Sequence, residues 1–192
     1  AIVLFALSGY ILFQYQEALG YTPEGKGKAR KNYKKGDPVQ LQVEMFLKDG
    51  SYSKAMTLLE ADAEKKGASL NQHERYHRLI WAMGAQERLY KHAVPYFKVL
   101  LQAGRDMQVA AIFRDYLQRY PDFRIEDPEV RLDLAQAFER LGDFKLAVHV
   151  LNGLHKDNPH FPALPTAYMM AARLLSDQLG MPQKGLALVQ FL

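Results

Sequence analysis

The clearest pattern in the chain is the recurrence of apolar residues every three or four positions from Pro38 onward. This spacing is typical of amphipathic helices that bury one face. A first helix is predicted between Pro38 and Gly50, on the stripe Val39, Val43, Phe46 and Leu47. Ser51 or Ser53 is expected to cap a second helix, whose apolar face is Ala55, Leu58, Leu59 and Ala63. These two segments form one predicted helical hairpin.

Further helices follow with the same spacing. Asn71 is expected to cap a longer helix, interrupted by Gly84, whose apolar positions are Tyr76, Leu79, Ile80, Met83 and Tyr90. Pro128 is expected in the first turn of a helix that carries Leu134, Ala135 and Phe138. Its partner helix carries Ala147, Leu151 and Leu154 and ends at Asn158 and Pro159. No segment shows sustained alternation of apolar and polar residues, so the predicted fold class is all-α with no sheet.

A second pattern is an internal repeat. Gly104, Gly142 and Gly180 lie 38 residues apart, and the residues around them repeat in phase. On this offset the aligned residues are Pro121 with Pro159, Phe123 with Phe161, Phe113 with Leu151 and Val189, and Val109 with Ala147 and Gly185. A fixed period of about 20 to 50 residues indicates an array in which each unit buries its apolar face against its neighbours.

The best repeat resembles the tetratricopeptide repeat (TPR). The matching positions are Leu134, Ala135, Phe138, Gly142, Asp143, Phe144, Ala147, Leu151 and Pro159. The family period is about 34 residues, which puts about four extra residues in the loops that hold Phe123 and Phe161. The resemblance covers about half of the chain and is weak before Lys91. It implies that residues 38–192 form a TPR-like right-handed superhelical solenoid of antiparallel helix hairpins.

The start of the chain has a different character, because residues 1–13 carry no charge. A helix that spans a bilayer needs about 20 apolar residues at a rise of about 1.5 Å each. Residues 1–19 are therefore interpreted as a membrane-anchor helix that is part of a longer segment. The alternatives are a buried core helix and the remnant of a signal-peptide apolar region.

Residues 20–37 are predicted to be a basic linker, because they are rich in Gly and Lys. The linker has six positive charges with no acid between them, at Lys26, Lys28, Arg30, Lys31, Lys34 and Lys35. Removing these charges takes the net charge from +4 to −2, which leaves no basic face of the kind that nucleic-acid binding needs. Next to a membrane helix, the run predicts a membrane-surface basic patch and a cytoplasmic repeat domain. If there is no membrane helix, the basic run is expected to be a solvated linker.

Composition limits the chemistry that the chain can perform. Its 48% hydrophobic and 24% charged residues are ordinary for a globular protein. There is no cysteine, which excludes disulfides, thiolate metal sites and cysteine nucleophiles. The serines lie in no nucleophile motif, and the glycines form no phosphate-binding loop. We therefore expect a protein that is not an enzyme and needs no cofactor.

One string offers an alternative. His73-Glu74-Arg75-Tyr76-His77 fits the pattern H-E-x-x-H, in which two histidines one helical turn apart bind zinc and the glutamate acts as a general base. It would make the protein a zinc metallohydrolase. However, Arg75 and Tyr76 replace the apolar residues that usually bury such a helix, and no strand is predicted to align a substrate. We interpret the string as ordinary surface residues and predict no metal site.

The TPR resemblance also implies a binding groove, because the first helix of each pair lines the concave side of such arrays. Carried over to this sequence, the groove residues are Lys91, Lys98, Gln102, Glu129, Asp133, Gln136 and Arg140. A mixed polar groove suits a peptide or a helix that is held by hydrogen bonds and ion pairs around an apolar anchor.

Together these patterns predict a non-catalytic protein–protein interaction scaffold or adaptor. It would be anchored in a membrane as a subunit or assembly factor of a membrane protein complex. Its expected partners are the proteins of that complex and the membrane, with no nucleic acid. One alternative keeps the array and places it in the periplasm, in envelope or cytochrome assembly; the other is the zinc hydrolase.

Overall fold

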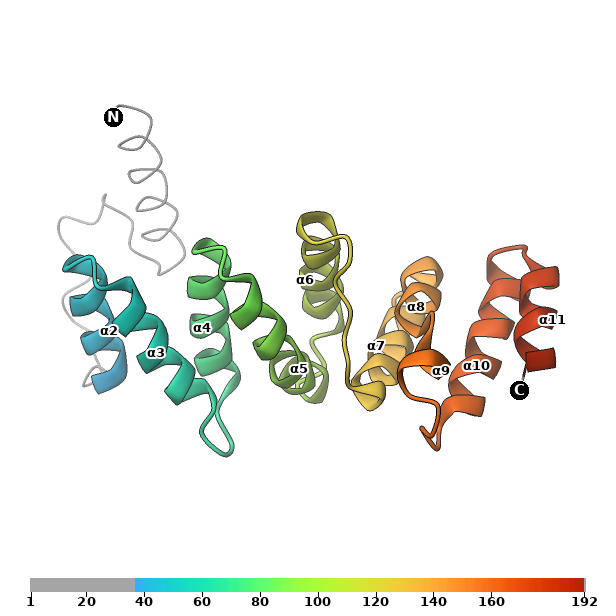
Figure 1. Ribbon diagram of the computed structural model, residues 1–192, viewed down its shortest axis with the longest axis horizontal. Coiled ribbons are helices and arrows are strands. Elements are labelled where there is room, and N and C mark those ends of the chain that lie inside the picture. Colours follow the sequence, from blue (N-terminus) through green and yellow to red (C-terminus); the bar gives the residue numbers. More distant parts are fainter. Residues whose placement is uncertain (1–36, 192) are drawn as a thin grey trace, which may run out of the picture. The chain divides into compact units, whose positions relative to one another are not determined.

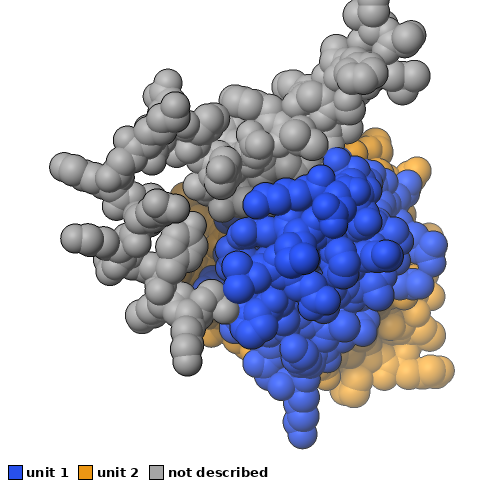
Figure 2. All heavy atoms as spheres, turned by 90° about the vertical axis from the view of Figure 1, so that its left-hand side faces the viewer, with its two compact units in different colours: residues 1–92 blue, residues 93–192 orange. Residues whose placement is uncertain are grey.

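The computed structural model describes residues 37–191 of the 192-residue chain. In this part every regular element is a helix (Figure 1), which confirms the predicted all-α class. The chain divides into two compact units, residues 1–92 and residues 93–192 (Figure 2). The boundary falls inside α5 (Gln86–Gln102), so the first part of this helix belongs to unit 1 and its second part to unit 2.

In unit 1, three helices precede the start of α5. They are α2 (Pro38–Lys48), α3 (Tyr52–Ala63) and α4 (Leu70–Ala82). α2 packs on α3, and α3 packs on α4. Each helix buries residues from its predicted apolar stripe, and among these core residues are Val43, Ala55, Leu59, Tyr76 and Ile80. Met83, predicted on the same face as Tyr76, instead forms the C-cap of α4 and is 37% exposed.

Unit 2 continues with the end of α5 and a series of helix pairs. Its elements are α6 (Asp106–Arg119), α7 (Pro128–Arg140), α8 (Phe144–Leu151), the short α9 (Leu154–Asp157), α10 (Leu164–Arg173), the π-helix η2 (Leu174–Gln178) and α11 (Pro182–Phe191). α7 packs on α8, and α10 packs on α11. The core is rich in aromatic rings; Tyr116 and Phe123 lie with their ring centroids 4.4 Å apart. The helix-hairpin architecture implied by the TPR resemblance is therefore present in this unit.

The three glycines of the 38-residue repeat occupy equivalent turns. Gly104, Gly142 and Gly180 have φ angles of +65°, +74° and +64°, in the left-handed region that residues with a β-carbon avoid. A β-carbon at any of them would meet no atom within 4 Å. The requirement for glycine is therefore one of backbone conformation, and the repeat marks turns between helices of unit 2.

Two predicted helix boundaries are wrong. α4 is capped by Ser69 rather than by Asn71, because Oε1 of Gln72 accepts hydrogen bonds from both the backbone N and the Oγ of Ser69. The helix predicted to run through Leu154 is broken after Leu151, where Asn152 is extended and Gly153 has a φ of +75°.

The predicted membrane-anchor helix over residues 1–19 and all six charges of the predicted basic patch lie outside the described residues. Of the predicted linker, only Asp37 is described, and it is the N-cap of α2. Within residues 37–191, no helix combines the length and the apolar character needed to cross a bilayer.

Candidate partner-binding surface on unit 2

The predicted groove is built around the start of α7. Asp127 is the N-cap of this helix, and its Oδ1 accepts hydrogen bonds from the backbone N of Glu129 and Val130. Its other oxygen, Oδ2, lies 2.7 Å from Nζ of Lys98 on α5. This hydrogen bond raises the pKa of Lys98. One carboxylate therefore both starts α7 and fixes the position of a cation on the neighbouring helix.

One face of α7 is lined by polar residues. They lie three or four positions apart and all are exposed: Glu129, Asp133, Gln136 and Arg140. At one end, Nε of Arg140 donates to Oδ2 of Asp106 on α6 at 2.8 Å, and this hydrogen bond raises the pKa of Arg140. At the other end, Glu129 adjoins the Lys98–Asp127 pair. Among the described residues, neither Glu129 nor Asp133 takes part in an ion pair.

Asp133 interacts electrostatically with both Lys98 and Arg140. Its negative charge contributes to the raised pKa of both Lys98 and Arg140. Like charges one helical turn apart repel each other, so Glu129 and Asp133 leave an unneutralised acidic stretch on α7. A partner that brings a cation to this stretch would relieve the repulsion.

Six of the seven predicted groove residues belong to unit 2. Lys98 and Gln102 lie one turn apart on α5, and the other four lie on α7. The seventh, Lys91, belongs to unit 1, where its Nζ pairs with Glu87 at 2.9 Å on the surface. The α7 face, defined as Lys98, Gln102, Glu129, Asp133, Gln136 and Arg140, is the candidate surface.

Sequence reasoning missed the ion pairs that flank this surface. Arg173 on α10 donates to Glu139 on α7, at the same 34-residue separation as Arg140 and Asp106. That shared separation of basic and acidic residues is the signal that could have found both pairs. Met169, on α10 one turn before Arg173, is 52% exposed.

A further ion pair repeats the arrangement seen at Asp127. Asp143 is the N-cap of α8; its Oδ1 accepts from the backbone N of Leu146, and its Oδ2 lies 2.6 Å from Nη2 of Arg114 on α6. Asp37 does the same in unit 1 with Val39 and Arg75. The N-cap aspartates thus connect neighbouring helices as well as starting their own.

The H-E-x-x-H string occupies a different setting from the one predicted. His73 and His77 are buried on α4 rather than exposed, with 4% and 8% of their surface accessible. Nδ1 of His73 lies 3.0 Å from Nε2 of the buried His92 on α5, and the rings of His77 and Trp81 stack at 5.9 Å. Within the described residues, no group of three potential ligands is placed to hold a metal ion. The histidines act as core residues of unit 1.

Burial has a clear electrostatic effect on this cluster. It lowers the pKa of His77 to about 4, with a smaller contribution from Arg78. It also lowers the pKa of His73 and of His92, the latter helped by the charges of its two histidine neighbours. The cluster is therefore neutral near pH 7. The spacing 73, 76, 77 and 80 matches a helical core stripe, which could have revealed the burial.

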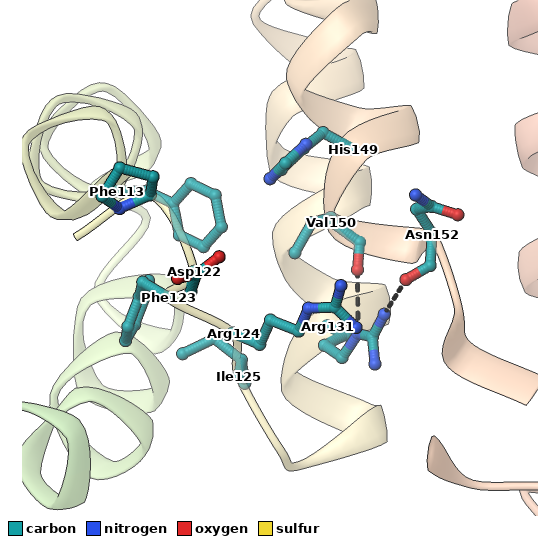
Figure 3. Close-up of a pocket in the computed structure, with 10 residues that line it drawn as sticks. Phe113, Asp122, Phe123, Arg124, Ile125, Arg131, His149, Val150 and Asn152 are labelled. Atoms are coloured by element: carbon teal, nitrogen blue, oxygen red, sulfur yellow. Dashed lines mark hydrogen bonds between the residues drawn. The ribbon is translucent and has the colours of Figure 1, made fainter. Parts of the chain in front are cut away.

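A small pocket of about 80 Å³ lies between the loop after α6 and the end of α8. Figure 3 shows that Arg131 reaches across its edge from α7. The side chain is 3% exposed; its Nε donates to the carbonyl of Val150 at 2.8 Å and its Nη2 to the carbonyl of Asn152 at 2.6 Å. Nη1 donates to Asp157 at 2.7 Å. Arg131 thus satisfies the carbonyls freed where α8 breaks, and its role is structural.

Comparison with known proteins adds little to this geometry. No family model matches the chain, and no curated protein is similar in sequence. Among solved structures, those named MamA AMB-1 P212121 and MamA AMB-1 C2221 are 16% and 17% identical over 79% of this chain, covering 86% and 93% of theirs, with TM-scores of 0.39 and 0.38. MamA MSR-1 C2 is 16% identical over 79% of this chain and 91% of its own, with a TM-score of 0.38. A likeness at this level carries no argument about function.

Proposed function

We propose that the protein is a non-catalytic protein-interaction scaffold of TPR-like architecture, and that the α7 face binds a protein segment. The observation that supports this most directly is the pair Glu129 and Asp133, two exposed acids one turn apart that are flanked by positioned cations. A bound segment with a basic residue would neutralise the acidic stretch, and the exposed Met169 would contact an apolar residue beside it.

Two finer parts of the proposal rest on the sequence alone. Residues 1–19 anchor the protein in a membrane, and the basic run between Lys26 and Lys35 contacts anionic lipid headgroups on the cytoplasmic side. The partner is then a subunit of a membrane protein complex. Protease access to the helical units from either side of the native membrane tests the side, and access from the periplasm would contradict the cytoplasmic placement.

The test of the α7 face is a comparison of matched charge reversals. The tagged protein and its variants are extracted in detergent from native membranes, and stoichiometric partners are identified by mass spectrometry. We expect Asp133→Lys, which puts a cation in the acidic stretch, to lose the partner that the unmodified protein retains, and Arg140→Glu, which adds an acid to the same face, to retain more of it. Circular dichroism checks that each variant keeps its helicity.

Arg114→Glu is the control for Arg140→Glu. Arg114 and Arg140 are 55% and 57% exposed and each pairs with one aspartate, but Arg114 lies outside the α7 face. Reversal at Arg114 is expected to leave retention of the partner unchanged. If both arginine variants change it equally, the effect comes from the broken ion pairs and the assignment of the surface is wrong.

A further inference from the structure

A second surface of unit 2 has the properties of a binding site and lies outside the α7 face. It is a groove of about 500 Å³ between α8, α10, η2 and α11. Its walls come from Val148 and Leu151 on one side and from Ala187 and Leu188 on the other. We call this the α8–α11 groove. Its volume falls within the range of ligand and peptide sites.

Both lysines among the residues that line the α8–α11 groove lie at its edge. Lys145 and Lys184 lie at the starts of α8 and α11, both are exposed, and His149 lies one turn after Lys145. No Asp or Glu is among the described residues that line the groove. An apolar groove with a basic rim and no acid complements an occupant that is apolar on one face and acidic at its edges.

The floor of the groove contains polar groups of His155 and Tyr168 that bond to each other. The hydroxyl of Tyr168 on α10 is hydrogen-bonded to Nδ1 of His155 and accepts from the backbone N of His155 at 3.2 Å. The remaining floor is apolar and includes Ala171 and Leu175. Because the polar groups there are bonded to each other, the floor favours contact with apolar side chains.

Two backbone features shape the groove. α10 continues into the π-helix η2, a rare element that is often found at functional sites, and Leu175 in η2 lines the groove. α11 lies close to this segment: a β-carbon at Gly185 would be 2.7 Å from the carbonyl oxygen of Ala172. Lys184, Ala187 and Leu188 of α11 line the groove, and Leu186 and Val189, at other positions around the helix, do not and are 55% and 42% exposed.

We propose that the α8–α11 groove binds an amphipathic helix of a partner protein whose apolar stripe is bordered by Asp or Glu. This inference rests on the proposed scaffold function, because it takes the occupant to be a protein. It adds a second binding surface with a defined charge preference. α8 has eight residues and is about 12 Å long at 1.5 Å per residue, so the groove matches a helix of two to three turns. Met181, 42% exposed at the end of the groove, can adapt to different apolar side chains.

The test uses two synthetic probes. Each is an amphipathic peptide of about 18 residues, or five turns, with leucines on one face; one carries Glu and the other carries Lys at the flanking positions. Binding is measured by fluorescence anisotropy on the full chain carrying Asp133→Lys, so that the Lys peptide does not find the acidic stretch of the α7 face. We expect the Glu peptide to bind at least roughly fivefold more tightly than the Lys peptide, from two or three exposed charge contacts. Equal affinities would overturn the proposal.

Two variants make the test specific. Ala187→Glu places an acid on an exposed lining residue and is expected to abolish binding of the Glu peptide without unfolding the helix. The double variant Lys145→Glu/Lys184→Glu is expected to reverse the preference in favour of the Lys peptide, an effect that general destabilisation cannot produce. Unchanged preference in the double variant would overturn the proposal.

The remaining outcomes distinguish binding at the α8–α11 groove from binding at the α7 face and from binding of lipid. Asp133→Lys is expected to leave binding of the Glu peptide unchanged while losing the native partner. If the Glu peptide fails to bind while Asp133→Lys still loses the partner, the groove proposal fails and the scaffold function stands. If vesicles of anionic phosphatidylglycerol bind through Ala187 and neither peptide does, the occupant is lipid and the proposal is wrong.

Discussion

The carboxylate of Asp143 both forms an ion pair with Arg114 and caps the start of α8. Nη2 of Arg114 lies 2.6 Å from Oδ2 of Asp143, while Oδ1 of the same carboxylate accepts the backbone N–H of Leu146 at 3.2 Å. The carboxylate therefore caps α8 and ties its first turn to α6. The Asp127 carboxylate has the same double role with Lys98 on α5. Helix initiation and docking between helices are coupled through single side chains.

This coupling gives a first prediction for stability. Asp143→Ala loses both the cap and the ion pair and is expected to lower the free energy of unfolding by about 1–2 kcal/mol. Asp143→Asn keeps an oxygen for the cap, and Arg114→Ala keeps the whole cap, so each should cost less than about 1 kcal/mol. Urea denaturation followed by circular dichroism measures all three. An Asn variant as unstable as the Ala variant would contradict the double role.

The buried histidines of unit 1 predict a dependence of its stability on pH. The pKa of His77 is about 4 in the folded chain and about 6.5 unfolded, so the unfolded state takes up the proton first as the pH falls. The stabilisation is complete above pH 6.5 and is lost toward pH 4, where His77 alone costs about 3 kcal/mol. The lowered pKa values of His73 and His92 add in the same direction.

Trp81 makes this prediction measurable, because it is the only tryptophan of the chain and stacks against His77 in unit 1. We expect its fluorescence to report a transition between pH 6.5 and 4 that precedes the main loss of helicity, since no buried histidine is found among the described residues of unit 2. His77→Leu should shift the transition to lower pH. A single transition at the same pH by both methods would contradict the prediction.

Gly185→Ala is expected to destabilise the packing of α11 for a steric reason. The added carbon would be 2.3 Å from Oγ of Ser176, which can rotate away, and 2.7 Å from the backbone oxygen of Ala172, which cannot. We expect a loss of about 1–3 kcal/mol in the free energy of unfolding.

Gly142→Ala is the comparison for this variant, because its cost of about 1 kcal/mol comes only from the positive φ. Asn tolerates that conformation, so Gly142→Asn should recover part of the loss, whereas Gly185→Asn should be worse than Gly185→Ala. Thermal unfolding of the four variants distinguishes the two causes, and recovery by Asn at both positions would contradict the steric explanation.

Arg131→Met should be among the most damaging single substitutions in unit 2. It removes three hydrogen bonds and leaves the carbonyls of Val150 and Asn152 without their donor, for an expected loss of about 2–4 kcal/mol. Arg124→Met is the control, because Arg124 lines the same pocket but is exposed, and it should change stability by less than about 0.5 kcal/mol. Equal stability of the two variants in urea would refute the structural role of Arg131.

Much of the helical fold could be predicted from local pattern. The apolar spacing located α2, α3 and α7, and the phase of Gly104, Gly142 and Gly180 located the hairpin turns, because both signals depend on residues close in sequence. The N-cap at Ser69 was missed because Ser69 and Asn71 both lie near the start of α4 and both residue types are favoured as caps. The π-helix was missed because apolar spacing does not distinguish five residues of π-helix from the α-helix that they continue.

The candidate site was predictable only in part. The TPR resemblance pointed to Glu129, Asp133, Gln136 and Arg140, which prove to be exposed on one helix, but neither resemblance nor spacing shows which charges are paired across helices. Lys98 and Arg140 prove to be held by Asp127 and Asp106, which leaves the acids of α7 as the unneutralised charges. The α8–α11 groove joins residues from four elements, and its basic rim appears only when those elements are assembled.

The three turn glycines also determine where this architecture can change length. Each turn closes in a conformation that depends on one residue without a β-carbon, so an inserted residue there would shift the pairing of both helices in the hairpin. The segments between one hairpin and the next, such as residues 120–127 and 158–163, contain no glycine and so include no turn of this kind. Deletions and insertions between related proteins should therefore collect in these connectors, while the distance from each helix to its turn glycine stays constant.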